Sequence, residues 1–129
     1  MIDRYDPETP PNSAEWLALD EGERIALVEA YHRDARIPLP KSARTVHAAI
    51  HTIVENQLAM DDQAVVRETM QRLLEEGLTR HDALHAIGSV LAELIADAFK
   101  EEPAPTDLNS PYQATLQELT SEKWLSRGG

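Results

Sequence analysis

Apolar side chains recur at every fourth position between residues 42 and 60, a spacing that fits one face of an α-helix. Four residues advance a helix by slightly more than one turn, so these side chains share one face. The positions are Val46, Ile50, Val54 and Leu58. The same segment carries His47 and His51, which this spacing places one turn apart. The sequence therefore predicts a helix that directs two imidazoles toward one point.

A second pair of histidines has the same spacing. His81 and His85 lie at the start of a segment whose periodicity predicts a helix over about 80–101. The chain contains five histidines, and random placement would give only about 0.15 pairs at this spacing. Two imidazoles on one helical face are a common arrangement for binding a transition metal.

The two pairs are predicted to meet. On a wheel of about 100° per residue, both pairs border the apolar face of their helix, and Glu55 flanks the first pair. Three consecutive helices with short connections run up, down and up, so the helices over 42–60 and 80–101 should be parallel. Each pair then lies at the same end of the bundle. The predicted metal ligands are His47, His51, Glu55, His81 and His85.

The ligand types limit the metal and the chemistry. Imidazole and carboxylate groups suit zinc, iron, nickel or copper, without a choice among them. The chain has no cysteine, which excludes disulfides and thiolate sites. The zinc-protease motif His-Glu-x-x-His is absent, because Ala48 and Asp82 follow the first histidine of each pair. Catalytic residues, the small-molecule substrate and the question of enzymatic activity stay open.

Two further groups of the chain offer possible ligand atoms. Glu29 and His32 form Glu-x-x-His, the spacing of di-iron bundles, but such a site needs two of these motifs and more glutamates. We therefore interpret His32 as structural. Glu93 follows His85 by eight residues but lies about 80° from it on the wheel, which makes it a weaker carboxylate candidate.

A second interpretation needs no metal. The histidines could complete the core through hydrogen bonds to backbone or carboxylate groups. The chain would then be a non-enzymatic helical interaction module that binds a protein partner through its acidic surface or its C-terminal segment. A homo-oligomer is also compatible with the sequence.

The fold class follows from helical periodicity without strand alternation: all-α, a single-domain bundle of about four to six helices with a small C-terminal docking helix. Further helices are expected over about 20–36 and 62–76. We expect an extended N-terminal arm over 1–12, the bundle over 13–102, and a Pro-containing linker with a short C-terminal helix over 103–129.

Capping residues predict several helix ends. Ser13 is expected to cap a short helical turn through Trp16 and Leu19, and Asp20 with Glu23 forms an acidic capping box. Gly77 has the position of a left-handed C-terminal cap, and Thr79 that of the next N-cap.

Charge excludes some partners. The 129 residues carry a formal net charge of −11, with 42% hydrophobic residues. Such a surface repels nucleic-acid phosphates and anionic lipids, so no nucleic acid and no membrane are expected as partners. The first residues lack a basic segment followed by an apolar run, which predicts no signal peptide. We expect a soluble cytoplasmic protein.

The histidine segments resemble an uncharacterised bacterial family, one of the "domain of unknown function" groups. Its members pair a Leu-His-x-x-x-His-x-x-x-Glu-Gln-like helix with a later His-x-Ala-x-His helix. Here the first segment runs from His47 through His51 and Glu55 to Gln57, and the second is His81-Asp-Ala-Leu-His85. Asn56 departs from the pattern by separating Glu55 from Gln57. The resemblance covers about residues 44–98 and implies a helical fold with recurring histidines, without an established activity.

Overall fold

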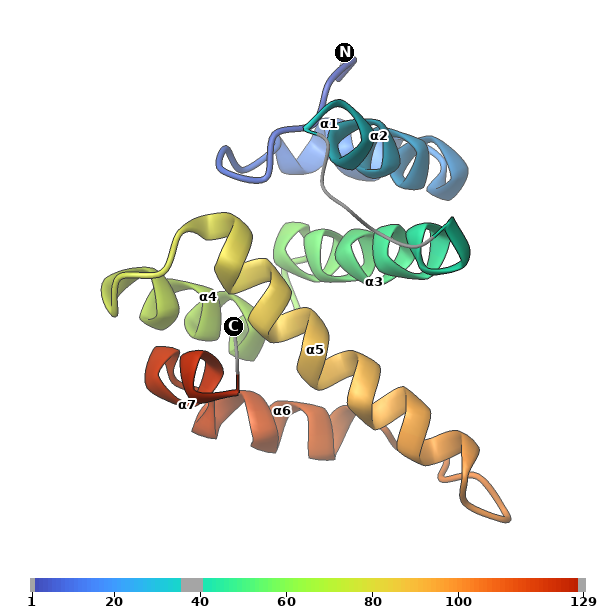
Figure 1. The fold of residues 1–129 in the computed structure, drawn as a ribbon, viewed down its shortest axis with the longest axis vertical. Coiled ribbons are helices and arrows are strands. Elements are labelled where there is room, and N and C mark those ends of the chain that lie inside the picture. Colours follow the sequence, from blue (N-terminus) through green and yellow to red (C-terminus); the bar gives the residue numbers. More distant parts are fainter. Residues whose placement is uncertain (1, 36–40, 128–129) are drawn as a thin grey trace. The chain divides into compact units, whose positions relative to one another are not determined.

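The structure is a computed structural model that describes residues 2–35 and 41–127, without the side chains of residues 41 and 42. These residues form seven helices and no strand, which confirms the all-α class. The chain divides into two compact units, Met1–Asp62 and Gln63–Gly129. This boundary lies inside the predicted bundle over 13–102. Figure 1 shows the helices of each unit.

The first unit contains three helices that follow an N-terminal segment (Figure 1). They are α1 (Ser13–Ala18), α2 (Glu21–Asp34) and α3 (Lys41–Ala59). α3 packs against both α1 and α2. The predicted end of α2 at residue 36 lies outside the described residues. The buried cluster of this unit is Tyr5, Trp16, Leu19, Val28 and Ala48.

Side-chain caps fix the beginnings of α1 and α2. Asp20 accepts a hydrogen bond from the Glu23 amide at 2.8 Å, and the Glu23 carboxylate accepts one from the Asp20 amide, so the predicted capping box is confirmed. The expectation that Ser13 caps α1 is wrong. Asn12 is the N-cap, because its side-chain oxygen accepts a hydrogen bond from the Glu15 amide at 3.0 Å.

The buried face of α3 differs from the predicted apolar stripe. Val46, expected to be buried, is 63% exposed. It lies about 100° from His47 on the helix, at the edge of the predicted face, and the packing is centred on the other side. The buried residues of α3 are Ala48, His51, Thr52, Val54 and Glu55. α3 therefore buries a largely polar stripe, and polar groups placed there need partners.

The second unit contains α4 (Ala64–Glu75), α5 (Arg80–Phe99), α6 (Asn109–Glu118) and α7 (Ser121–Ser126). α4, α5 and α6 pack against one another. Pro111 lies in the first turn of α6, where a missing backbone N–H is tolerated, so this proline does not prevent the helix. Two short helices therefore follow the linker.

The turn between α4 and α5 sets the position at which α5 begins. The helix begins at Arg80, directly before His81. Gly77 has a φ of 103°, and the amides of Gly77 and Leu78 donate to the carbonyls of Leu74 and Leu73. This is the predicted left-handed cap in its Schellman form. Thr79 then accepts a hydrogen bond from the Asp82 amide at 3.1 Å, which confirms it as the N-cap of α5.

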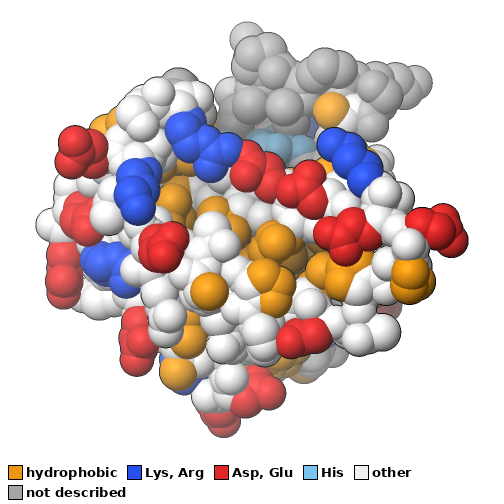
Figure 2. All heavy atoms as spheres, turned by 90° about the horizontal axis from the view of Figure 1, so that it is seen from below, with side chains coloured by type: hydrophobic (Ala, Val, Ile, Leu, Met, Phe, Trp, Pro, Cys, Tyr) orange, Lys and Arg blue, Asp and Glu red, His pale blue; other side chains and the backbone are white. Residues whose placement is uncertain are grey.

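Acidic side chains are spread around apolar ones on the face drawn in Figure 2. Within the described residues, none of the helices is both long enough and apolar enough to cross a bilayer.

Candidate functional site

Three histidines of the first unit lie together where α2 packs on α3. The Nε2 atoms of His32 and His47 are 3.1 Å apart, and their ring centroids are separated by 4.6 Å. The His51 ring centroid lies 5.2 Å from that of His32. His32 and His51 are 6% and 3% exposed, so both rings are shielded from water. Two helices thus converge on one cluster of imidazoles.

Hydrogen-bond partners indicate where the protons of His32 and His47 lie. The Nδ1 atom of His32 is 2.8 Å from the Val28 carbonyl oxygen, which can only accept, so Nδ1–H donates to it. In a neutral imidazole the lone pair is then on Nε2, which faces His47. His47 donates its Nε2–H to this lone pair in the present state. Fixing one ring nitrogen with a carbonyl is the arrangement that orients histidines which bind metals.

Tyr5 joins the third histidine to a buried carboxylate. Its hydroxyl lies 2.7 Å from Nε2 of His51 and donates a very short hydrogen bond to Oε2 of Glu55. Glu55 is 1% exposed. Because the Tyr5 proton goes to the carboxylate, the hydroxyl oxygen accepts from Nε2–H of His51. The lone pair of His51 is then on its buried Nδ1 atom.

Aromatic rings surround this cluster. Tyr31 contacts His32 edge-on, with ring centroids 5.3 Å apart. Tyr31 also contacts Tyr5 edge-on, with ring centroids 6.2 Å apart. Burial raises the pKa of Tyr31, and the nearby carboxylates of Asp6 and Glu8 raise it further. The rings of Tyr5 and Tyr31 thus contact those of His51 and His32.

A second network attaches α1 and α2 to α3. The indole N–H of the fully buried Trp16 donates to Oδ1 of Asn56 at 2.9 Å. The Arg24 guanidinium donates to the same oxygen at 3.1 Å, and to the carbonyls of Leu17 and Leu19. Asn56 thus anchors both preceding helices one turn from the histidine cluster.

The second unit carries the other histidine pair at the start of α5. The ring centroids of His81 and His85 are 4.3 Å apart, and a ring nitrogen of one lies within 4.8 Å of a ring nitrogen of the other. Both Nε2 atoms are buried. His81 lies in the first turn of α5.

The predicted site residues thus fall into two groups. His47, His51 and Glu55 lie together on α3, and His81 lies beside His85 on α5. The meeting of the two pairs depends on the placement of the two units, and it stays a prediction. Glu93 forms an exposed ion pair with Arg127.

Sequence reasoning missed two members of the cluster. His32 follows the buried Val28 by one helical turn, and this position on the packed face of α2 was a usable signal. It was considered only as the partner of Glu29. Tyr5 lies in a segment without periodicity, and no local pattern shows that its hydroxyl reaches residues 46 and 50 positions later.

The separation of the two Nε2 atoms has a chemical meaning. The two nitrogens are 3.1 Å apart. If an ion bound each of them at about 2.05 Å, the N–metal–N angle would be about 100°, close to tetrahedral or cis-octahedral geometry. Transfer of the His47 proton from Nε2 to Nδ1 would present both lone pairs to such an ion. Without an ion, the same atoms form a hydrogen bond. The geometry is compatible with both states.

Comparison with known protein families identifies a relationship for most of the chain. A protein family described as a domain of unknown function (DUF1841) matches residues 27–118, which include all five histidines and Glu55 but not Tyr5 or Trp16. No curated protein and no solved structure matches the chain.

Proposed function

The chain belongs to this family of unknown function, DUF1841, and we propose that it binds a divalent transition-metal ion through the imidazoles of His32, His47 and His51. The observation that carries the proposal is the 3.1 Å separation of the His32 and His47 Nε2 atoms. Two buried imidazoles and one half-buried imidazole, from two packed helices, are a donor set suited to zinc, iron, nickel or copper.

The residues of the histidine cluster have different roles in this proposal. His32 offers Nε2, since its Nδ1–H is held by the Val28 carbonyl. His51 offers Nδ1, since its Nε2–H is held by the Tyr5 hydroxyl. Glu55 orients His51 through Tyr5, in the manner of carboxylates that hold metal-binding histidines from behind. This changes Glu55 from the direct ligand of the sequence-based hypothesis to a positioning residue.

The pair on α5 is retained in the proposal as a separate pair of nitrogen donors. His81 and His85 have the spacing and ring separation of a two-point ligand on one helix. A site with three nitrogens leaves a coordination position open, where hydrolytic metal proteins hold an activated water and redox metals hold an exchangeable ligand.

One observation favours a second candidate function. Polar side chains of α3 form hydrogen bonds within the first unit: His47 bonds His32, and Tyr5 bonds both His51 and Glu55. A hydrogen-bonded core of this kind needs no ion. The chain would then be a helical interaction module whose histidines are structural.

Calorimetric titration separates the two candidates. Protein treated with a chelator and dialysed is titrated with Zn²⁺, Ni²⁺, Cu²⁺ and, without oxygen, Fe²⁺; natively purified protein is analysed for bound metal. The proposal expects saturable binding of at least one ion and a loss of affinity of at least about tenfold in His47→Ala.

Gln57→Ala is the matched control, because Gln57 is a half-buried polar residue of the same helix. It should leave the affinity unchanged. A chain that is metal-free after native purification and binds none of the four ions supports the interaction module instead.

A further inference from the structure

A pocket of about 290 Å³ opens beside the histidine cluster, between the N-terminal segment and α2. This volume is at the lower end of the range of small-molecule sites, about 300–1,000 Å³. All of its lining residues belong to the first unit. They are Asp3, Arg4, Tyr5, Leu27, Ala30, Tyr31, Asp34 and Ala35.

The floor of the pocket is apolar and aromatic. Leu27, Ala30 and Tyr31 follow one face of α2 at helical spacing and are half-buried. Tyr5 closes the inner side with a ring that is 7% exposed, set edge-on to Tyr31. A floor of this composition favours an alkyl group or a positive charge placed against aromatic rings.

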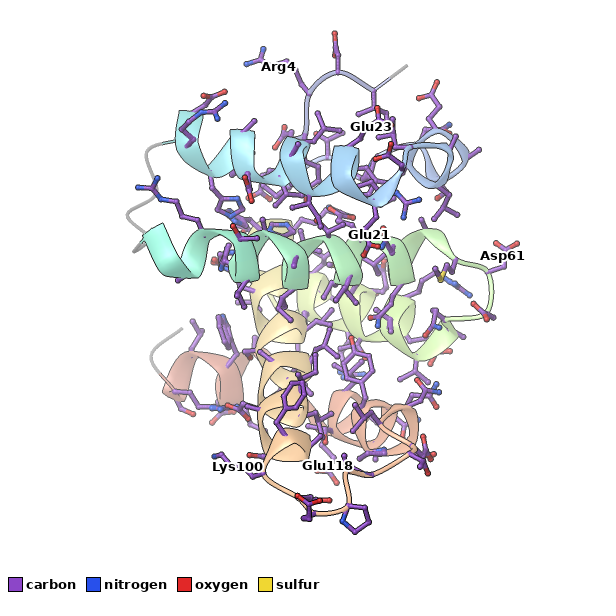
Figure 3. All side chains as sticks on the ribbon, turned by 90° about the vertical axis from the view of Figure 1, so that its right-hand side faces the viewer. Arg4, Glu21, Glu23, Asp61, Lys100 and Glu118 are labelled. Carbon is purple, nitrogen blue, oxygen red and sulfur yellow. The ribbon has the colours of Figure 1, made fainter. Side chains whose placement is uncertain are left out.

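The rim of the pocket is charged and exposed. Asp3 and Asp34 contribute carboxylates and Arg4 a guanidinium. Figure 3 shows Arg4 on the N-terminal segment, with its side chain extending away from α3. Arg33 lies 3.6 Å from Asp34, but both side chains are about 70% exposed, so this pair neutralises the carboxylate only weakly.

Two more carboxylates act electrostatically on Tyr31, which lines the pocket. Asp6 and Glu8 help to raise the pKa of Tyr31, after the larger effect of burial. These carboxylates add negative charge near the pocket, in keeping with the formal net charge of −11. An anionic ligand would meet carboxylates on several sides, whereas a cation would meet one guanidinium.

From this arrangement we propose that the pocket binds a small primary amine with an apolar tail. The ammonium group lies at the rim and donates hydrogen bonds to Asp3 and Asp34. The alkyl part lies on Leu27 and Ala30 and against the two tyrosine rings. This site goes beyond the metal proposal, because none of its lining residues is a proposed metal ligand.

The test uses the full chain, kept metal-free with a chelator, and three ligands of nearly equal size. n-Butylammonium, n-butanol and butyrate are titrated to about 50 mM while backbone amide NMR signals are followed. n-Butylammonium is expected to give saturable shifts at residues 3–5 and 27–35, with a Kd in the range of about 1 mM. The neutral and anionic ligands should give none.

Three exposed variants connect the binding to the rim. Asp34→Asn and Asp3→Asn should each weaken n-butylammonium binding by about two- to fivefold, and Arg4→Gln should strengthen it by up to about twofold. The unshifted amide signals of α3 verify that each variant is folded. Equal binding of butyrate or butanol, the absence of saturation, or indifference to all three variants would overturn the site. Metal titration of the same samples separates this outcome from failure of the metal proposal.

Discussion

The Nε2 atom of His32 on α2 lies 3.1 Å from the Nε2 atom of His47 on α3. The residues are 15 positions apart in sequence, on helices that pack together. The Nε2 atoms of the two rings face each other. The Val28 carbonyl fixes the tautomer of His32, because it accepts the Nδ1–H hydrogen bond. This pair is the contact on which the proposed metal site depends.

Tyr5→Phe should destabilise the first unit by about 1–3 kcal/mol. The substitution keeps the ring but removes the hydroxyl that bonds His51 and Glu55, and the buried carboxylate loses a donor. Urea unfolding followed by Trp16 fluorescence, in a Trp124→Phe background that removes the other tryptophan, measures the change.

A double-mutant cycle with Glu55→Gln checks the cause. If the short hydrogen bond carries the effect, the two substitutions should be coupled by more than about 0.5 kcal/mol. Additive losses would mean that the Tyr5 hydroxyl acts through its contact with His51 and not through Glu55.

Asn56→Ala should destabilise the same unit by about 1–3 kcal/mol, because the buried Trp16 indole N–H and Arg24 lose their shared acceptor. Asn56→Asp keeps the oxygen and is the matched control. We expect it to retain most of the stability in the same fluorescence measurement. A larger loss in the aspartate variant than in the alanine variant would contradict the assignment.

The two glycines at helix ends should respond to alanine in opposite directions. Gly77 has a φ of 103°, so Gly77→Ala should destabilise the second unit by about 1–2 kcal/mol. Gly22 lies in α2, and an added Cβ would meet Oδ1 of Asp20 at an ordinary 3.4 Å. Gly22→Ala should stabilise the first unit by up to about 1 kcal/mol. Amide hydrogen exchange in each unit gives both values, and effects of the same sign would contradict the backbone argument.

Asp107 should titrate below the ordinary value for an aspartate. A side-chain hydrogen bond from Ser110 and the backbone amides of Ser110 and Asn109 hold its pKa low at the start of α6. Since the folded pKa lies below the unfolded one, the carboxylate stabilises α6 above the unfolded pKa, and this contribution is lost as the pH falls through the folded pKa.

Carboxyl ¹³C NMR measures this pKa, and amide exchange of residues 109–112 follows the helix end. Asp107→Asn should remove the pH dependence of that exchange. An Asp107 that titrates at or above its ordinary value would show that the hydrogen bonds are not maintained in solution.

Local sequence signals predicted the features of this fold that depend on a few neighbouring residues. The capping box of Asp20 and Glu23, the left-handed Gly77 and the Thr79 N-cap are all decided within five or six positions. The prediction failed for Val46, because the face of α3 that becomes buried is decided by α1 and α2 and not by its own apolar stripe.

The candidate site divides in the same way. The pairing of His47 with His51, and of His81 with His85, follows from four-residue spacing. The inclusion of His32 requires knowledge of how α2 packs on α3, and that of Tyr5 requires the path of a non-helical segment. Tertiary packing decides both, and one sequence carries little information about it.

The central claim is tested most directly by the ring nitrogens of His32. In ¹⁵N-labelled, metal-free protein, Nδ1 of His32 should appear as protonated and Nε2 as bearing the lone pair. On addition of one equivalent of Zn²⁺, the account predicts a large shift of the His32 and His47 Nε2 signals while Nδ1 of His32 keeps its proton. Unchanged Nε2 signals of both residues at saturating Zn²⁺ would contradict it.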